Sequence, residues 1–189
     1  MGRNQEFDTN AVLDKAMELF WHQGYEKTSI QQLTEYMGIE RGSIYNTFGG
    51  KHKLFLTVLA HYQELNHPDH LNQLDNVPSI KQLLGQLLLS VIDDSTSKKG
   101  CLVVNTLVEM AAHNEQLRSI VTDDLKYVQK LFFQALQKGK QTGEFSSEMN
   151  AEAMAAFFVN HYVGLQALSK SNMDKESLVS TIDTLLSYL

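Results

Sequence analysis

Apolar residues recur at helical spacing along almost the whole chain. Between residues 11 and 24 they fall at Val12, Ala16, Leu19 and Phe20, a spacing that puts all four on one face of a helix. The same kind of pattern predicts further helices over residues 29–37, 40–48, 51–66, 79–93, 101–112, 116–142, 151–169 and 175–189. No alternating strand pattern of useful length interrupts it, so the sequence predicts an all-α protein.

The predicted helices form a crowded N-terminal group and a longer C-terminal group. Residues 28–55 hold a short amphipathic helix, a glycine turn, a second very short helix and a basic helix start, an order that predicts a helix-turn-helix. We therefore expect a three-helix N-terminal domain over residues 1–50 and a larger helical domain over residues 51–189, linked by the helix that begins at about residue 51. Residues 67–79 hold both prolines and little apolar periodicity, and are predicted to form a loop.

The second very short helix has an inward and an outward face. Ile44 and Phe48 lie close together on a helical wheel, while Gly42 and Asn46 lie near the opposite side. A glycine lets the backbone approach another surface closely, and an asparagine can form a bidentate pair with adenine. The neighbours that can reach phosphates or base edges are Arg41, Ser43 and Tyr45. This face suits the major groove of DNA.

The helix that follows begins with the basic residues Lys51, His52 and Lys53. The positive end of a helix dipole favours acidic residues instead, by about 0.3–1 kcal/mol each when exposed. Cations there are locally unfavourable unless an anion arrives, and a DNA phosphate, bound also by free backbone N–H groups, would supply it. The alternative is that these are ordinary solvated side chains after a glycine-rich loop.

Charge and composition narrow the class of protein. The net charge is −6, and residues 1–55 carry 6 Lys and Arg against 7 Asp and Glu, so DNA binding has to come from locally arranged charge. The single cysteine, Cys101, permits no disulfide within the chain, and no apolar run is long enough for a membrane span or a signal peptide. We therefore expect a soluble, cytoplasmic protein with no membrane partner.

A longer pattern resembles a known family. It consists of G-x-x-x-T-S-I from Gly24, G-S-I-Y-x-x-F from Gly42 and K-x-x-L-F from Lys51, with Phe20 in the helix before them. Over residues 10–60 the chain resembles the TetR family of bacterial transcriptional regulators, and the total length and the helical remainder fit that family as well.

The resemblance implies a set of DNA contacts. Thr28 would anchor a phosphate at the start of the first motif helix, and Lys51, with His52 beside it, would bind phosphate from the helix after the motif. The residues that would face DNA from the short second helix are Arg41, Gly42, Ser43, Tyr45 and Asn46. Gly50 stands where Ser or Asn is common in the family, and His52 and Lys53 stand where acidic residues are frequent. We interpret these departures as tuning toward a particular operator.

One short reading helix contacts few base pairs, so the sequence predicts a homodimer whose two heads bind a palindromic operator. The last two helices carry broad apolar stripes and, as the resemblance also implies, would form a four-helix bundle with those of the partner. The residues expected at this interface are Phe158, Tyr162, Leu165, Ile182, Leu185 and Leu186. The alternative is that both stripes pack within their own domain.

The middle helices would then enclose a pocket for an unknown small-molecule effector. Asn105 and Glu109 share a helix face and would orient the ligand, or else lie at the solvent edge. The other residues expected to line the pocket are Tyr62, Cys101, Tyr127, Phe158, His161 and Tyr162. Cys101 follows Gly100 at a predicted helix start, where the dipole can activate a thiol. This G-C-L block resembles a subgroup of the family with sensing cysteines, and a buried inert cysteine is the alternative.

Other chemistry has little support. His61, His67 and His70 lack the spacing of a metal site, and no serine, histidine or acid falls in a catalytic spacing. We expect no metal, no cofactor and no enzyme activity. The sequence predicts a DNA-binding transcriptional regulator, a repressor whose homodimer leaves its operator when a small molecule binds. One alternative is an activator or dual regulator of the same family, and the other is a helical ligand-binding or interaction protein that has lost sequence-specific DNA binding.

Overall fold

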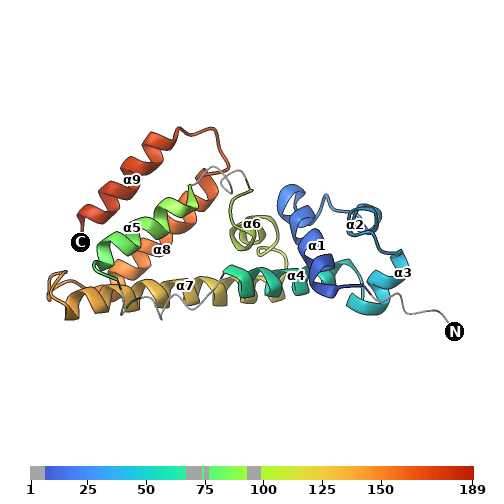
Figure 1. Cartoon of the computed structure of the whole chain (residues 1–189), viewed down its shortest axis with the longest axis horizontal. Helices are drawn as coiled ribbons and strands as arrows, with labels where there is room; N and C mark the ends of the chain where they lie inside the picture. Colours follow the sequence, from blue (N-terminus) through green and yellow to red (C-terminus); the bar gives the residue numbers. More distant parts are fainter. Residues whose placement is uncertain (1–6, 67–73, 75–76, 93–98) are drawn as a thin grey trace. The chain divides into compact units, whose positions relative to one another are not determined.

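The computed structural model describes residues 7–66, 74, 77–92 and 99–189, and every regular element within these ranges is a helix (Figure 1). The all-α prediction is therefore confirmed. Packing divides the chain into two compact units, Met1–His67 and Pro68–Leu189. Most of the loop predicted over residues 67–79, together with His67 and His70, lies outside the described residues.

The first unit holds the predicted helix-turn-helix. Its elements are α1 (Thr9–Gln23), α2 (Ile30–Met37), the very short α3 (Arg41–Ser43), the π-helical segment η1 (Ile44–Phe48) and α4 (Lys51–Asn66). Helix α4, which was expected to link two domains, packs against α1 and η1 inside the first unit. The short helices thus rest on a scaffold of two longer ones.

Local sequence signals set the ends of these helices. Asp8 caps α1, and its carboxylate accepts hydrogen bonds from two backbone N–H groups of the first turn. Ser29 and Gln32 form a capping box at the start of α2, with distances of 3.1 and 2.8 Å. Gly38 ends α2 at φ +73°, in the left-handed region that glycine adopts without strain. The turn between the two motif helices is therefore encoded locally.

One apolar core holds the first unit together. Phe20 of α1 and Phe55 of α4 pack edge to face, with ring centroids 5.0 Å apart, and both are almost fully buried. At the surface of the same helix pair, His61 Nε2 lies 2.7 Å from Asp14 Oδ1. His61, weighed above as a metal ligand, thus ties α4 to α1.

The second unit is a helical bundle. Its elements are α5 (Ile80–Val91), α6 (Leu102–Glu109), α7 (Glu115–Gln141), α8 (Ala151–Leu168) and α9 (Lys175–Ser187). Helices α7 and α8 pack extensively on each other, and α5 lies against α7, α8 and α9 (Figure 1). Side chains from all four make up its core, among them Leu84, Leu88, Phe132, Leu136, Phe158 and Ile182. None of the helices described in either unit is both long and apolar enough to cross a membrane.

Candidate nucleic-acid interface and regulatory unit

The short motif helix is anchored by the two residues that the wheel placed inward. Ile44 is 0% exposed and Phe48 is 9% exposed, so both side chains are held in the core of the first unit. The opposite side presents five exposed residues, which are Arg41, Gly42, Tyr45, Asn46 and Thr47. Ser43 is half-buried at the edge of this face. The structure thus brings the sequence-predicted reading residues together on one exposed surface.

Thr47 is the member of this surface that the sequence analysis missed. On an α-helical wheel it lies nearer to Ile44 than to the outward face. Thr47 is nevertheless exposed, and η1 is π-helical, a wider turn that often occurs at functional sites. The wheel assumed regular α-helical geometry, which these five residues do not have.

Two of the reading residues contact each other. The guanidinium carbon of Arg41 lies 5.8 Å from the centroid of the Tyr45 ring, within the range of a cation–π interaction. Tyr45 is 47% exposed, a high value for a tyrosine. The Arg41 guanidinium, supported by this ring, presents a planar fork of N–H donors at the surface, and such a fork suits a guanine edge or a phosphate.

Thr28 does not fit the role that the resemblance implied. Its side chain is 1% exposed. The hydroxyl donates a 2.6 Å hydrogen bond to the Gly24 carbonyl oxygen and accepts a 3.0 Å hydrogen bond from Gln23 Nε2. Both bonds stabilise the turn between α1 and α2, so we revise the expectation of a phosphate contact to a structural role for this side chain.

The start of α4 combines two glycines with three basic residues. Gly49 and Gly50 precede it at φ +76° and +108°, and no acidic residue lies in its first turn. Lys51 and His52 are half-buried and Lys53 is exposed. Gly50, in a conformation that Ser or Asn would strain, leaves the helix start without a side-chain cap from that position. The first turn of α4 therefore carries basic side chains and no acidic one, at the position where the sequence predicts a phosphate contact.

The second unit gathers polar groups in its interior. Burial raises the pKa of the Tyr162 phenol, and so does Cys101 nearby; a hydrogen bond from Gln166 lowers it, while Asp124 raises it further. The Tyr162 phenol therefore keeps its proton and remains a hydrogen-bond donor. Cys101 is the N-cap residue of α6, as predicted, but its side chain is buried.

Asp124 is the interior residue that the sequence analysis missed. It is only 7% exposed. Its signal was an acidic residue in the apolar stripe of α7, where Val121 and Val128 precede and follow it at helical spacing. An acid at such a position marks either a paired structural group or a ligand contact.

Asn105 and Glu109 do not share an environment, although they are four residues apart. The Asn105 amide donates to the Lys99 carbonyl oxygen (3.0 Å) and accepts from Lys170 Nζ (2.9 Å), so its side chain ties α6 to the segment before it and to the turn that follows α8. Glu109 is exposed at the end of α6. The alternative reading, a tie to a neighbouring helix and a solvent edge, describes their positions.

The remaining predicted pocket residues lie in several places. Tyr62 belongs to the first unit and packs edge to face on Trp21, with centroids 5.1 Å apart. Phe158 is 0% exposed in the core of the second unit, and Tyr127 is half-buried on α7. His161 lies on the outer side of α8, where its Nδ1 contacts the Phe157 carbonyl oxygen at 2.8 Å. Of the predicted set, Cys101 and Tyr162 are thus the pair that lies together inside.

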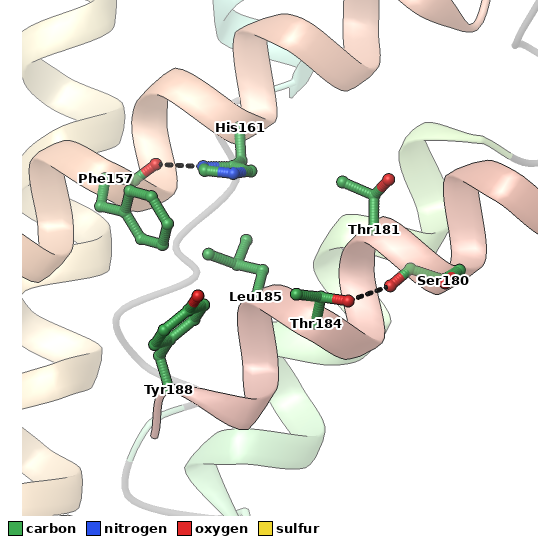
Figure 2. A pocket seen from close by; sticks show the side chains of 7 residues that line it. All are labelled: Phe157, His161, Ser180, Thr181, Thr184, Leu185 and Tyr188. Carbon is green, nitrogen blue, oxygen red and sulfur yellow. Dashed lines mark hydrogen bonds between the residues drawn. The ribbon is translucent and has the colours of Figure 1, made fainter.

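The predicted dimer residues face mostly inward. Four of them are at most 2% exposed within their own unit, and they are Phe158, Leu165, Ile182 and Leu185. Tyr162 and Leu186 are half-buried. A pocket on the outer face of α8 and α9 is shown in Figure 2, and Leu185 is the one predicted dimer residue among those that line it. Its lining residues are Phe157, His161, Ser180, Thr181, Thr184, Leu185 and Tyr188.

Comparison with known proteins agrees with this arrangement along the whole chain. Residues 12–58 match the bacterial regulatory proteins of the tetR family, and residues 80–185 match the tetracyclin repressor-like C-terminal domain. The uncharacterized HTH-type transcriptional regulator YezE of Bacillus subtilis (strain 168) is 31% identical over 193 residues, with 100% of both chains covered. The HTH-type transcriptional repressor ComR of Escherichia coli (strain K12) is 27% identical, covering 98% of this chain and 90% of ComR.

A solved structure of an operator complex is similar to this chain. A cysteine-substituted form of the TetR family transcriptional regulator CifR, complexed with 26bp double-strand operator DNA, has a TM-score of 0.85 and 30% identity over 98% of each chain. A helix-turn-helix head and a helical C-terminal unit in one chain define a DNA-binding transcriptional regulator. The chain belongs to the TetR family, as the matches to both of its parts show.

Proposed function

We propose that this protein is a repressor whose homodimer binds a palindromic operator and leaves it when a small molecule binds the second unit. The observation that carries the proposal is the exposed face of α3 and η1. Arg41, Tyr45, Asn46 and Thr47 point outward there while Ile44 and Phe48 fix the helix from within. Arginine, asparagine and threonine supply donors and acceptors for base edges, and tyrosine supplies a hydroxyl for phosphate.

The cations at the start of α4 complete this DNA surface. Lys51, His52 and Lys53 occupy the helix turn whose N–H groups lack intrahelical partners. A phosphate there would be bound by backbone and side chain together. The relatives point the same way, since ComR is a repressor and CifR was solved on operator DNA.

We place the dimer interface on the outer face of α8 and α9. Helix α8 contains one charged residue, Glu152, and a helix that is apolar nearly all round is ordinarily buried on every side. Its outer stripe includes Phe157, which is 37% exposed, and Gly164, beside which an added Cβ would meet nothing within 4 Å. A second copy of α8 could approach closely over such a stripe.

The facing surface of α9 is suited to burial although it is rich in hydroxyl groups. Thr181 donates to the Ser177 carbonyl oxygen (3.0 Å) and Thr184 donates to the Ser180 carbonyl oxygen (2.8 Å), as Figure 2 shows for the second pair. Because these hydroxyl donors are satisfied within the helix, a partner can cover them without leaving them unpaired. Tyr188, 62% exposed, stands at the end of the same face.

The effector is proposed to act on the interior polar groups Tyr162, Asp124 and Cys101. The Tyr162 phenol offers a donor and the carboxyl group of Asp124 offers acceptor oxygens in apolar surroundings, which is the usual composition of a small-molecule site. A ligand that binds one arrangement of the helices better than another shifts the equilibrium toward that arrangement. The spacing of the two DNA-binding heads, and with it their fit to DNA, changes as a result.

The alternative function, a helical binding protein without DNA recognition, is disfavoured by the exposed Arg41 and Tyr45 pair. A protein that had lost DNA binding would have no use for an exposed tyrosine under an arginine. The two functions predict different results in one experiment.

That experiment measures DNA binding by fluorescence anisotropy with a duplex selected from a random-sequence library by the wild-type protein. We expect Tyr45→Ala and Lys51→Ala each to weaken binding at least tenfold and to leave the helical circular-dichroism spectrum unchanged. Lys126→Ala is the matched control, because Lys126 is an exposed lysine on α7 whose side chain lies 3.6 Å from Asp123. Enrichment of no duplex, or equal binding by all three variants, would favour the alternative.

A further inference from the structure

We propose that Tyr25 is a positioning residue of the DNA interface, whose aromatic ring holds the Lys51 ammonium at the start of α4 for contact with a phosphate. The inference rests on the proposed function, because it concerns the same phosphate contact. Tyr25 lies in the turn between α1 and α2, outside the reading helix, and nothing in the sequence analysis singled it out.

The ring of Tyr25 is fixed from two helices. Its centroid lies 6.0 Å from that of Phe20 on α1, with nearly parallel planes, and 4.9 Å from that of Phe55 on α4. Phe20 and Phe55 are 1% and 2% exposed, so the ring rests on the core of the first unit. The backbone is fixed as well, since the Thr28 N–H donates a 3.2 Å hydrogen bond to the Tyr25 carbonyl oxygen.

The ammonium group of Lys51 lies over a face of this ring. Its Nζ lies 4.1 Å from the ring centroid, well inside the range of about 6 Å for a cation–π interaction. His52, the next residue, meets the ring at right angles with centroids 6.3 Å apart. Two basic residues in the first turn of α4 therefore share one aromatic support, and no acidic residue lies in that turn to take its place.

This contact prepares the lysine without using up its hydrogen bonds. An ammonium carries three N–H donors, and a ring below it attracts the charge as a whole while leaving donors free for phosphate oxygens. A lysine side chain that is held before binding loses less conformational freedom when it binds. Avoiding part of this ordering cost should raise DNA affinity by about 2- to 5-fold per head and about 5- to 30-fold for two heads.

The test is a double-mutant cycle on the full-length protein, with the duplex selected by the wild type as the probe. Tyr25→Leu keeps an apolar side chain and removes the ring face, Lys51→Met removes the ammonium, and the double variant combines them. We expect Tyr25→Leu to raise the Kd about 5- to 30-fold in the wild-type background and to have little effect when Lys51 is already Met. Tyr25→Phe keeps the ring and should bind within about twofold of the wild type.

A merely structural role for Tyr25 predicts something different. The loss on Tyr25→Leu would then be the same with Lys51 or with Met at that position, and additivity would overturn the proposal. Tighter binding by Tyr25→Leu would overturn it too, because the ring would then be competing with DNA for the lysine. If Tyr25→Leu does not fold, Tyr25→Met takes its place in the cycle.

The slope of log Kd against log salt gives a second readout. Lys51→Met should lower the slope by about 1 per head, and Tyr25→Leu should lower it by less, since the lysine remains but is less well placed. If the wild type selects no duplex, or Lys51→Met binds normally, the proposed function itself fails. If Lys51→Met is weakened but Tyr25→Leu is additive with it, only the role of Tyr25 fails.

Discussion

The carboxylate of Glu144 accepts a 2.6 Å hydrogen bond from the hydroxyl of Ser79, 65 residues earlier in the chain. The same carboxylate accepts from the backbone N–H groups of Ile80 (2.8 Å) and Lys81 (3.0 Å), which open α5. Ser79 is itself the N-cap residue of α5 and accepts from the Gln82 N–H. The turn after α7 thus completes the cap of a helix that is remote in sequence.

This cap predicts a pH-dependent contribution to stability. Burial alone would raise the pKa of Glu144, but the hydrogen bonds from Ser79, Ile80 and Lys81 and the charge of Lys81 lower it overall from its ordinary value of 4.5. A lowered pKa in the folded state means that the contribution is present above the unfolded pKa and is lost as pH falls through the folded pKa.

Glu144→Ala should therefore lower the free energy of unfolding at pH 7, by less than the roughly 1 kcal/mol of a lost N-cap, because Ser79 still caps α5. The difference from the wild type should shrink steadily as the pH is lowered below 4.5, the ordinary value of this carboxyl group. Urea unfolding at neutral and at acid pH measures both differences. An undiminished difference at low pH would show that the carboxylate charge has no part in the cap.

Gly42→Ala tests whether the backbone of α3 comes close to DNA, separately from any effect on folding. Gly42 lies in α3, and an added Cβ would meet nothing within 4 Å. Alanine in a helix is favoured over glycine by about 0.5–1 kcal/mol, so the variant should be as stable as the wild type or more so. If this backbone approaches DNA closely, the Kd for the selected duplex should nevertheless rise at least fivefold. Normal affinity would mean that Gly42 faces DNA at a distance, and thermal unfolding provides the stability control.

The sequence was a good guide wherever structure is encoded locally. Helix faces follow apolar spacing, and ends follow residues such as Ser29 and Gly38, whose caps and dihedral angles need no distant partner. It was a poor guide where geometry departs from the regular helix, as at Thr47, or where a hydroxyl is turned inward by distant contacts, as at Thr28.

The same limit applies to helix faces that are apolar all round. Helix α8 is apolar nearly all round, so its sequence could not tell whether the stripe with Phe158, which is fully buried, or the face with Phe157, which is exposed, meets the unit's own core. Only packing against α7 and α5 decides between them. The predicted dimer residues were drawn from the side that the unit's own core uses.

Comparing substitutions at Gly100 and Gly143 tests how closely the start of α6 packs against the end of α8, with Gly143 as the control. Both have positive φ, +64° and +76°, but a Cβ on Gly100 would lie 2.9 Å from the Gln166 carbonyl oxygen, whereas one on Gly143 would meet nothing within 4 Å. Gly143→Ala should cost about 1–2 kcal/mol for the left-handed conformation alone. Gly100→Ala should lower the free energy of unfolding by more than that, as measured in urea. Equal losses in the two variants would show that the start of α6 moves away from α8 without cost.

Phe157→Glu tests the outer face of α8 and α9. A charge at this partly exposed position should leave the fold intact and shift the protein from dimer to monomer at micromolar concentration, as measured by light scattering after size exclusion. Leu89→Glu is the control, because Leu89 on α5 is 42% exposed and is not among the residues that line the pocket on this face. A stable dimer in Phe157→Glu would move the interface elsewhere.

In the proposed complex, two copies of the exposed face on α3 and η1 read two major grooves of one DNA duplex. Hydroxyl-radical footprinting and base-contact interference on the selected duplex can show whether they do. We expect two equivalent protected segments related by a two-fold axis, centred one helical turn of about 34–36 Å or a multiple of it apart. We also expect Asn46→Ala to lose interference at one base position in each half-site. A single protected segment, or a footprint without two-fold symmetry, would contradict this proposal.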